Sequence, residues 1–227
     1  MNLTPPPITD NIEALREWCE DLYKFLEFPV FPGGVNIGNT TNYAEIKNDG
    51  EINLHGTAQT KCVVQFTSEL EHGATPPDYT ELGDYPTWSY DVDDDSKIAA
   101  PIPKWADSSA TAQIHIVWCI NEAYATASGE IQWQADWSAC PYDATEALDG
   151  PTHNGQIKSG DVNIPATAKF LTVTSLTAIA AASIADDDII GAKISRIAKD
   201  DGADPTADPC IVAVLIEFTK DKLGEAT

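Results

Sequence analysis

Basic residues are scarce in this chain: 13 lysines and arginines stand against 36 aspartates and glutamates, a formal net charge of −23. Because Lys and Arg contacts to phosphate supply most of the affinity for nucleic acids, this balance argues against DNA, RNA and anionic membranes as partners. No apolar run approaches the roughly 20 residues of a membrane span. The first residues also lack the basic and apolar regions of a secretory signal. We therefore expect a soluble protein that is made in a cytoplasm.

Sequence signatures of catalysis and of metal binding are also missing. There is no GxSxG, HExxH, GxxxxGK[ST] or GxGxxG pattern, and the five cysteines lack CxxC spacing, which indicates reduced thiols. A pair of carboxylates suited to glycoside hydrolysis is expected by chance at this acid content. The aspartate clusters at 91–95, 186–188 and 200–208 lack the EF-hand spacing, and we interpret them as solvated loops rather than calcium sites. The sequence predicts no enzyme, no cofactor and no metal.

A short amphipathic helix is predicted near the start of the chain, and proline ends it at Pro29 and Pro32. Its apolar seam has the three-four spacing of a coiled coil: Ile12, Leu15, Cys19, Leu22 and Leu26. Two heptads are marginal alone, so the helix either packs on its own β domain or joins a bundle of copies. Apolar residues outside the seam are predicted to form a contact surface for a partner or another subunit: Ile8, Phe28, Val30 and Phe31. Residues 1–33 thus form an arm with an assembly helix.

The rest of the chain is predicted as mainly β structure in three parts. Residues 34–70 form a small β-hairpin segment around the turn signal Asn48-Asp49-Gly50. Residues 71–106, rich in proline and acid, are predicted as a linker or loop with little regular structure. Its aromatic residues alternate with acids and are the candidate glycan contacts, or else they pin the linker onto the β domain: Tyr79, Tyr85, Trp88 and Tyr90.

Residues 107–227 are predicted as a jelly-roll-like antiparallel β domain that folds independently. Apolar residues alternate with polar ones at 114–120 and 131–137, as in a sheet with one buried face. Further strands are expected near 156–164, 169–176, 188–197 and 210–218. The last of these is apolar on both faces, so it should lie centrally in a sheet or at a subunit interface. Residues 178–185 are compatible with helix or strand.

Several of these segments resemble virion structural proteins of tailed bacteriophages. In that group an extended NYxEf run is followed by DGxlxxxGxAt, and here residues 41–46 read TNYAEI before Asn48-Asp49-Gly50 and Gly56-Thr57-Ala58. The strands IHIVW at 114–118 and GEIQW at 129–133 are also similar to that group, as is DIIG at 188–191. The resemblance covers most of residues 10–227.

This resemblance implies a non-enzymatic virion part that is made in the bacterial host cytoplasm. It implies a decoration (cement or head-fibre) protein on the outer head surface, where a homotrimer with an outward jelly roll stabilises the shell. The implied partners are further copies of the chain and the major capsid protein. The alternative is a trimeric tail or fibre protein that binds host-surface glycans through its aromatic linker or its loops.

Overall fold

A computed structural model describes residues 35–47, 51–66, 71–103, 106–107, 109–123, 129–143, 145–185, 188–199, 205–220 and 222–224. The chain divides into a small unit, Met1–Ala58 with Lys222–Thr227, and a larger unit, Gln59–Asp221. The predicted arm and helix of residues 1–33, with all their seam and contact residues, lie outside the described residues. Within the described ranges, no helix is long and apolar enough to cross a membrane.

The small unit contains the predicted hairpin. Its four-stranded sheet has the order β1 (Val35–Gly38), β2 (Tyr43–Ile46), β3 (Ile52–His55) and β16 (Lys222–Gly224). Tyr43 pairs with His55 across the hairpin, and the two rings stack with their centroids 4.2 Å apart. Gly56 opens the 3-10 turn η1 (Gly56–Ala58) at φ +61°, where a Cβ would collide with the carbonyl of Thr41. The GTA segment is therefore glycine-dependent for a steric reason.

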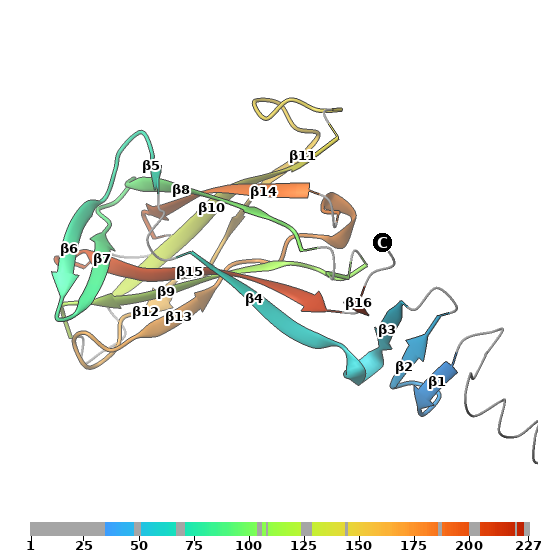
Figure 1. The fold of residues 1–227 in the computed structure, drawn as a ribbon. Helices are drawn as coiled ribbons and strands as arrows, with labels where there is room; N and C mark the ends of the chain where they lie inside the picture. The colour runs from blue at the N-terminus through green and yellow to red at the C-terminus, as the bar shows by residue number, and fades with distance from the viewer. Residues whose placement is uncertain are drawn as a thin grey trace, which may run out of the picture. The chain divides into compact units, whose positions relative to one another are not determined.

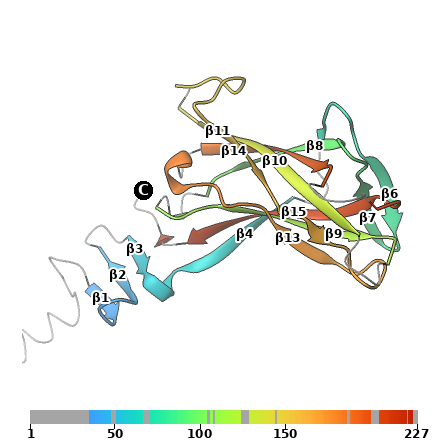
Figure 2. The same cartoon turned by 180° about the vertical axis from the view of Figure 1, so that it is seen from behind.

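The larger unit consists of two six-stranded sheets. The first sheet has the order β11 (His153–Lys158), β10 (Glu130–Pro141), β14 (Asp188–Ile197), β8 (Asp95–Pro101) and β5 (Glu71–His72), with β12 (Val162–Asn163) on β10. The second has the order β13 (Thr172–Ser175), β9 (Gln113–Ile120), β15 (Pro209–Lys220), β7 (Tyr85–Ser89) and β6 (Asp78–Leu82), with β4 (Thr60–Phe66) on β15. Figures 1 and 2 show the two sheets as separate layers.

The fold is an antiparallel, jelly-roll-like β sandwich, as the sequence predicted. The expected alternation is observed in β9, where the core-facing side chains are fully buried: Ile114, Ile116, Trp118 and Ile120. Trp133 of β10 meets Trp118 edge-on across the sandwich, with ring centroids 6.3 Å apart, and Tyr90 packs on Trp133 at 5.5 Å. These large rings join the two layers because each buries its area against the opposite sheet.

Strand β15 lies centrally in the second sheet, which confirms one of the two positions expected for the apolar C-terminal run. It pairs with β9 along one side and with β7 and β4 along the other. The pairing with β9 shifts register between Ile211 and Ala213, so Val212 sits in a bulge. A bulge adds one unpaired residue and redirects its side chain.

The prediction that residues 71–106 form a loop with little regular structure is wrong. Strands β5, β6, β7 and β8 lie in this region and belong to both sheets. Proline misled the prediction: Pro86 lies inside β7, paired only with the edge strand β6 at that position, and Pro101 is the last residue of β8. Proline is tolerated at such places because no central ladder bond is lost.

The predicted domain boundaries also change. The sequence places residues 60–66 in the hairpin segment, but they form strand β4, which pairs with β15 in the larger unit. Strand β16, near the C-terminus, instead joins the four-stranded sheet of the small unit. The 156–164 region contains two short strands, β11 and β12. The ambiguous stretch 178–185 holds the 3-10 turn η2 (Ala181–Ser183), preceded by a bridge between Ile179 and Ala112.

Candidate functional site

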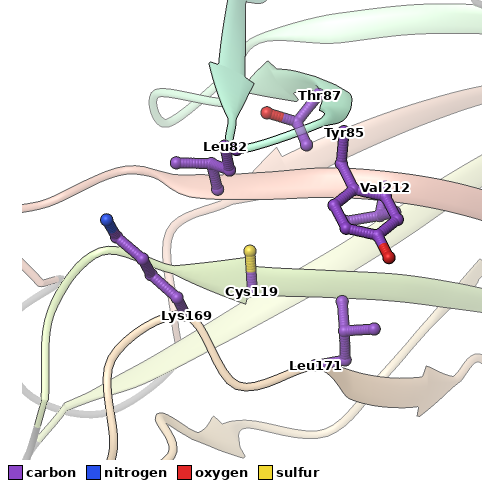
Figure 3. A pocket seen from close by; sticks show the side chains of 8 residues that line it. Leu82, Tyr85, Thr87, Cys119, Lys169, Leu171 and Val212 are labelled. Carbon is purple, nitrogen blue, oxygen red and sulfur yellow. The ribbon is translucent and has the colours of Figure 1, made fainter.

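A pocket of about 430 Å³ opens on the outer face of the second sheet. Four segments distant in sequence form it: the β6–β7 turn, the end of β9, the bulge of β15 and residues 169–171. Figure 3 shows their side chains around the cavity. The lining residues are Leu82, Gly83, Tyr85, Thr87, Cys119, Lys169, Leu171 and Val212.

Local backbone geometry positions this lining. Gly83 has φ +68° in the two-residue turn that pairs Leu82 with Tyr85, so both side chains reach the pocket. Lys169 is one of two described non-glycine residues with positive φ, at +64°, and its amide donates a 2.7 Å hydrogen bond to the Ile120 carbonyl. That hydrogen bond holds Lys169 in a backbone conformation that most side chains disfavour. Leu171, two residues later, lies at the pocket and is 64% exposed.

The chemistry of the pocket suits binding of an apolar group. Lys169 is the only charged residue among those lining it. Burial, and to a smaller degree the neighbouring Cys210, raise the pKa of the Cys119 thiol to about 11, although Lys169 acts in the opposite direction. A thiol with this pKa is protonated at neutral pH and is a weak nucleophile. The hydroxyl of Thr87 is engaged, since it donates to the Thr80 carbonyl at 3.1 Å.

The four predicted glycan contacts do not form one site. Residues 85 and 87 of β7 face the pocket, whereas Trp88 points to the opposite face of the sheet, as strand alternation requires. Tyr79 pairs with Trp88 on that face, ring to ring at 6.1 Å, and is largely exposed. Tyr90 is fully buried, where burial raises its pKa and its hydroxyl bonds to Ser96. The prediction that Tyr90 contacts a glycan is therefore wrong, because no ligand can reach its buried ring.

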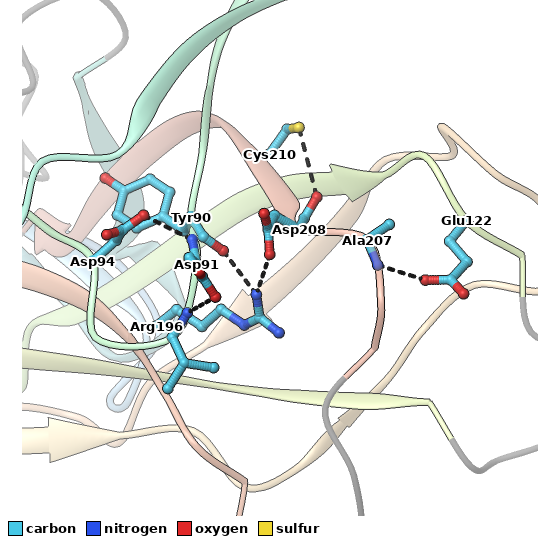
Figure 4. Close-up of polar contacts among 9 residues, drawn as sticks. Tyr90, Asp91, Asp94, Glu122, Arg196, Ala207, Asp208 and Cys210 are labelled. Atoms are coloured by element: carbon cyan, nitrogen blue, oxygen red, sulfur yellow. Dashed lines mark hydrogen bonds and ion pairs between the residues drawn. The ribbon is translucent and has the colours of Figure 1, made fainter.

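The aspartates after Tyr90 form a compact turn around a buried cation. Arg196, only 1% exposed, donates from Nη1 to the Tyr90 carbonyl at 2.8 Å and to Oδ1 of Asp208 at 2.9 Å (Figure 4). The Asp93 amide donates to the Arg196 carbonyl, and the Asp91 amide donates to Oδ2 of Asp94. Among the described residues, no group of three or more acidic, histidine or cysteine side chains is placed to hold a metal. These carboxylates act as caps and as one ion-pair partner.

A second carboxylate holds the segment that leads into β15. Oε2 of Glu122 accepts from the Ala207 amide at 3.0 Å, and Oε1 accepts from the Thr206 hydroxyl at 2.9 Å. The first of these bonds is drawn in Figure 4 beside the Arg196 cluster. These two hydrogen bonds hold residues 206 and 207 in place, and so position the next residue, Asp208, beside Arg196.

One polar row on the outer face has the order of a catalytic triad. Nδ1 of His115 lies 2.8 Å from the hydroxyl of Ser175, and its Nε2 lies 3.6 Å from Oε2 of Glu217. Glu217 is also paired with Lys61 at 2.8 Å, and hydrogen bonding to Lys61 is the largest cause of its lowered pKa. Ser175 of β13 pairs directly with His115 of β9, whereas Glu217 of β15 pairs with Gln113 and so lies diagonal to His115. None of the three residues lines the pocket. Cross-strand bonds of this kind stabilise a sheet.

Comparisons with known proteins give distant similarities only. No protein-family model matches the sequence, and no curated protein matches it. Among solved structures, dimeric latent PorU from Porphyromonas gingivalis is 10% identical over 72% of this chain, with a TM-score of 0.35, and this chain spans only 13% of its length. The xylan-binding module CBM15 is 12% identical over 70% of this chain and 97% of that chain, with a TM-score of 0.40. Peanut lectin in complex with a nonapeptide is 10% identical over 73% of this chain and 100% of that chain, with a TM-score of 0.30. The identities of these three structures are 10–12% and their TM-scores are 0.30–0.40, so each similarity is distant.

Proposed function

We propose that this chain is a non-enzymatic virion structural protein of a tailed bacteriophage, displayed on the outer head surface as a homotrimeric decoration protein. The small-unit hairpin is the observation that carries the proposal. Two residues that carry the resemblance to phage virion proteins have structural roles in the hairpin. Tyr43 stacks on His55 of the partner strand, and Gly56 has a positive φ and no room for a Cβ. The segment that resembles phage virion proteins thus folds as a hairpin whose shape depends on the resembling residues.

Charge and surface chemistry support the same proposal. A net charge of −23 disfavours binding to packaged DNA and suits the outside of a shell. The sandwich also carries large apolar side chains at the surface around the pocket, among them Phe170, Leu171 and Val173. Exposed apolar groups gathered in this way are typical of a protein-binding surface.

Binding to heads tests the proposal. We expect the purified chain to co-sediment with undecorated phage heads and to saturate them. Deletion of residues 1–32, which removes the predicted helix and apolar arm, should abolish that binding while the larger unit stays folded. If the truncated chain saturates heads at wild-type affinity, the arm has no docking role. If the full chain does not bind heads at all, the decoration function is wrong.

The alternative function is glycan binding by a tail or fibre protein. It is supported by the exposed ring of Tyr79, which packs on Trp88 and whose hydroxyl bonds to Glu81 at 3.2 Å. An aromatic face beside a carboxylate is suited to a sugar. A glycan array separates the two functions: a specific signal that Tyr79→Ala removes, without head binding, would favour the alternative.

The absence of enzymatic activity can be tested at the Ser175–His115–Glu217 row. Nucleophilic catalysis also requires donors that stabilise an oxyanion beside the serine, whereas Ser175 lies on the regular edge strand β13, paired with His115. We expect hydrolysis of an activated ester at the same rate by the wild type, Ser175→Ala and His115→Gln. A loss of about 100-fold or more in either variant would show that the row is catalytic.

A further inference from the structure

Two places on the sandwich each hold more than one exposed large apolar residue. One is the pocket, lined by Tyr85 and Leu171, with Phe170 next to Leu171 in the chain. The other is the connection from β10 to β11, which carries Tyr142 and Leu148. Leu148, at 76% exposure, is the most exposed of them.

These two places lie at opposite ends of the sandwich. Cys119 of the pocket is near the end of β9, and residues 121–129 lead from there to the start of β10. Strand β10 then runs for 12 residues before the loop begins, a rise of about 40 Å at ~3.4 Å per residue. Figures 1 and 2 both show this loop projecting beyond β11, away from the β6–β7 turn. Leu148 therefore cannot enter the pocket of its own chain.

The loop is held in shape by its own carboxylates. Oδ1 of Asp143 accepts from the Thr145 amide at 3.1 Å, and Oε2 of Glu146 accepts from the Thr152 amide at 2.8 Å. Hydrogen bonds to these threonines are the first cause of the lowered pKa of both carboxyls, so both are ionised at neutral pH. The Gly150 amide closes the tip on the Ala147 carbonyl at 3.1 Å. Leu148 is thus presented on an ordered support, which reduces the entropy lost on binding.

Loop and pocket are complementary in charge as well as in polarity. Glu146 and Asp149 flank Leu148, whereas the pocket lining contains Lys169 and no carboxylate. Two copies of a chain with a net charge of −23 repel each other over most approaches. Approach of an acidic loop to an apolar pocket with one cation avoids that repulsion.

We propose that Leu148 of one copy inserts into the pocket of the next copy, with Asp149 or Glu146 facing Lys169. This inference deepens the proposed function, since it rests on the proposed homotrimer and supplies its contact. The contact is heterologous, loop to pocket, and three such contacts close a ring when the rotation between neighbours is threefold.

Mass measurements on the full chain test the contact. By light scattering over a micromolar concentration series, the wild type should reach about 73.5 kDa, three times the 24.5 kDa chain. Leu148→Asp and Leu171→Asp should each weaken association about 30-fold, the effect of losing a central apolar anchor, and so remain near 24.5 kDa. Val63→Asp, a change at an exposed valine outside both surfaces, should keep the wild-type mass. Thermal unfolding of each variant establishes that it is folded.

Two further measurements separate this contact from other modes of association. Lys169→Asp and Asp149→Lys should each weaken association, and the double variant should recover it; aspartate tolerates the left-handed conformation of residue 169. An equimolar mixture of Leu148→Asp and Leu171→Asp should form a species of about 49 kDa, twice 24.5 kDa, because one intact loop meets one intact pocket without closing a ring.

The inference is overturned if the wild type stays monomeric over the series, or if both aspartate variants keep its mass. It is also overturned if Leu171→Asp loses head or glycan binding at unchanged mass, because the pocket then takes another occupant. Head binding by a monomeric wild type would leave the decoration function standing without this contact.

Discussion

A chain that begins at residue 107 should fail to fold, whereas residues 59–221 should fold alone. The shorter piece lacks β4 and β7, which cover one side of β15, and β8, which pairs with β14 along seven residues. It also loses core side chains from the removed region: Tyr90, Ile98, Ala100 and Ile102. Burial of each of the three large side chains contributes about 1.5–3 kcal/mol, together about 4.5–9 kcal/mol. That loss is comparable to the roughly 5–15 kcal/mol that stabilises a typical domain, and the loss of strand pairing adds to it.

Circular dichroism and amide NMR dispersion of the two purified pieces provide the measurement. Residues 59–221 should show a cooperative thermal transition, since they form one compact unit. Residues 107–221 should show none and should aggregate through the unpaired edges of β14 and β15. A cooperative transition in the shorter piece would mean that β4 to β8 are an accessory layer.

Asp208→Asn should destabilise the protein by about 3 kcal/mol, the lower end of the range for a buried charge that loses its counter-ion. Asp208 faces the guanidinium of Arg196 at 2.9 Å, and the arginine side chain is 1% exposed while that of Asp208 is 41% exposed. The substitution keeps the shape and removes the charge. The buried cation then loses the anion that offsets its desolvation, and the turn of residues 90–95 loses its anchor.

Asp136→Asn is the matched control. It makes the same substitution in an ion pair of similar length, 3.0 Å to Lys193, whose side chains are 36% and 41% exposed. Exposed pairs contribute about 0–1 kcal/mol. Urea unfolding of the wild type and both variants, with the slope held common, gives the two differences. Equal effects in the two variants would contradict a special role for the buried cation.

Strand identity in the second half of the chain was readable from the sequence. Alternation at 114–120 and 131–137 reports a sheet with one buried face, and the observed core residues of β9 and β10 follow it. The same rule failed in residues 71–106, because proline and aspartate dominate the composition there. Only pairing with β14 shows that Ile98 is an interior position.

The residues of the candidate site were harder to predict for a related reason. The aromatic residues Tyr79, Tyr85, Trp88 and Tyr90 are close in sequence, yet strand alternation and burial send them to three different environments. The pocket joins residues 82–87, 119, 169–171 and 212, and its bulge at Val212 depends on a register shift between β9 and β15. The one local signal was the adjacent pair Phe170 and Leu171, two bulky apolar side chains at the start of the strand predicted near 169–176.

By itself the sequence determined the β class, the acidic surface and the hairpin with its required glycine, because these depend on local spacing, charge count and backbone sterics. The tertiary structure alone decided which strands share a sheet, where Arg196 finds its anion and how the pocket is lined. Those features depend on contacts between segments far apart in the chain, and local propensity carries no information about such partners.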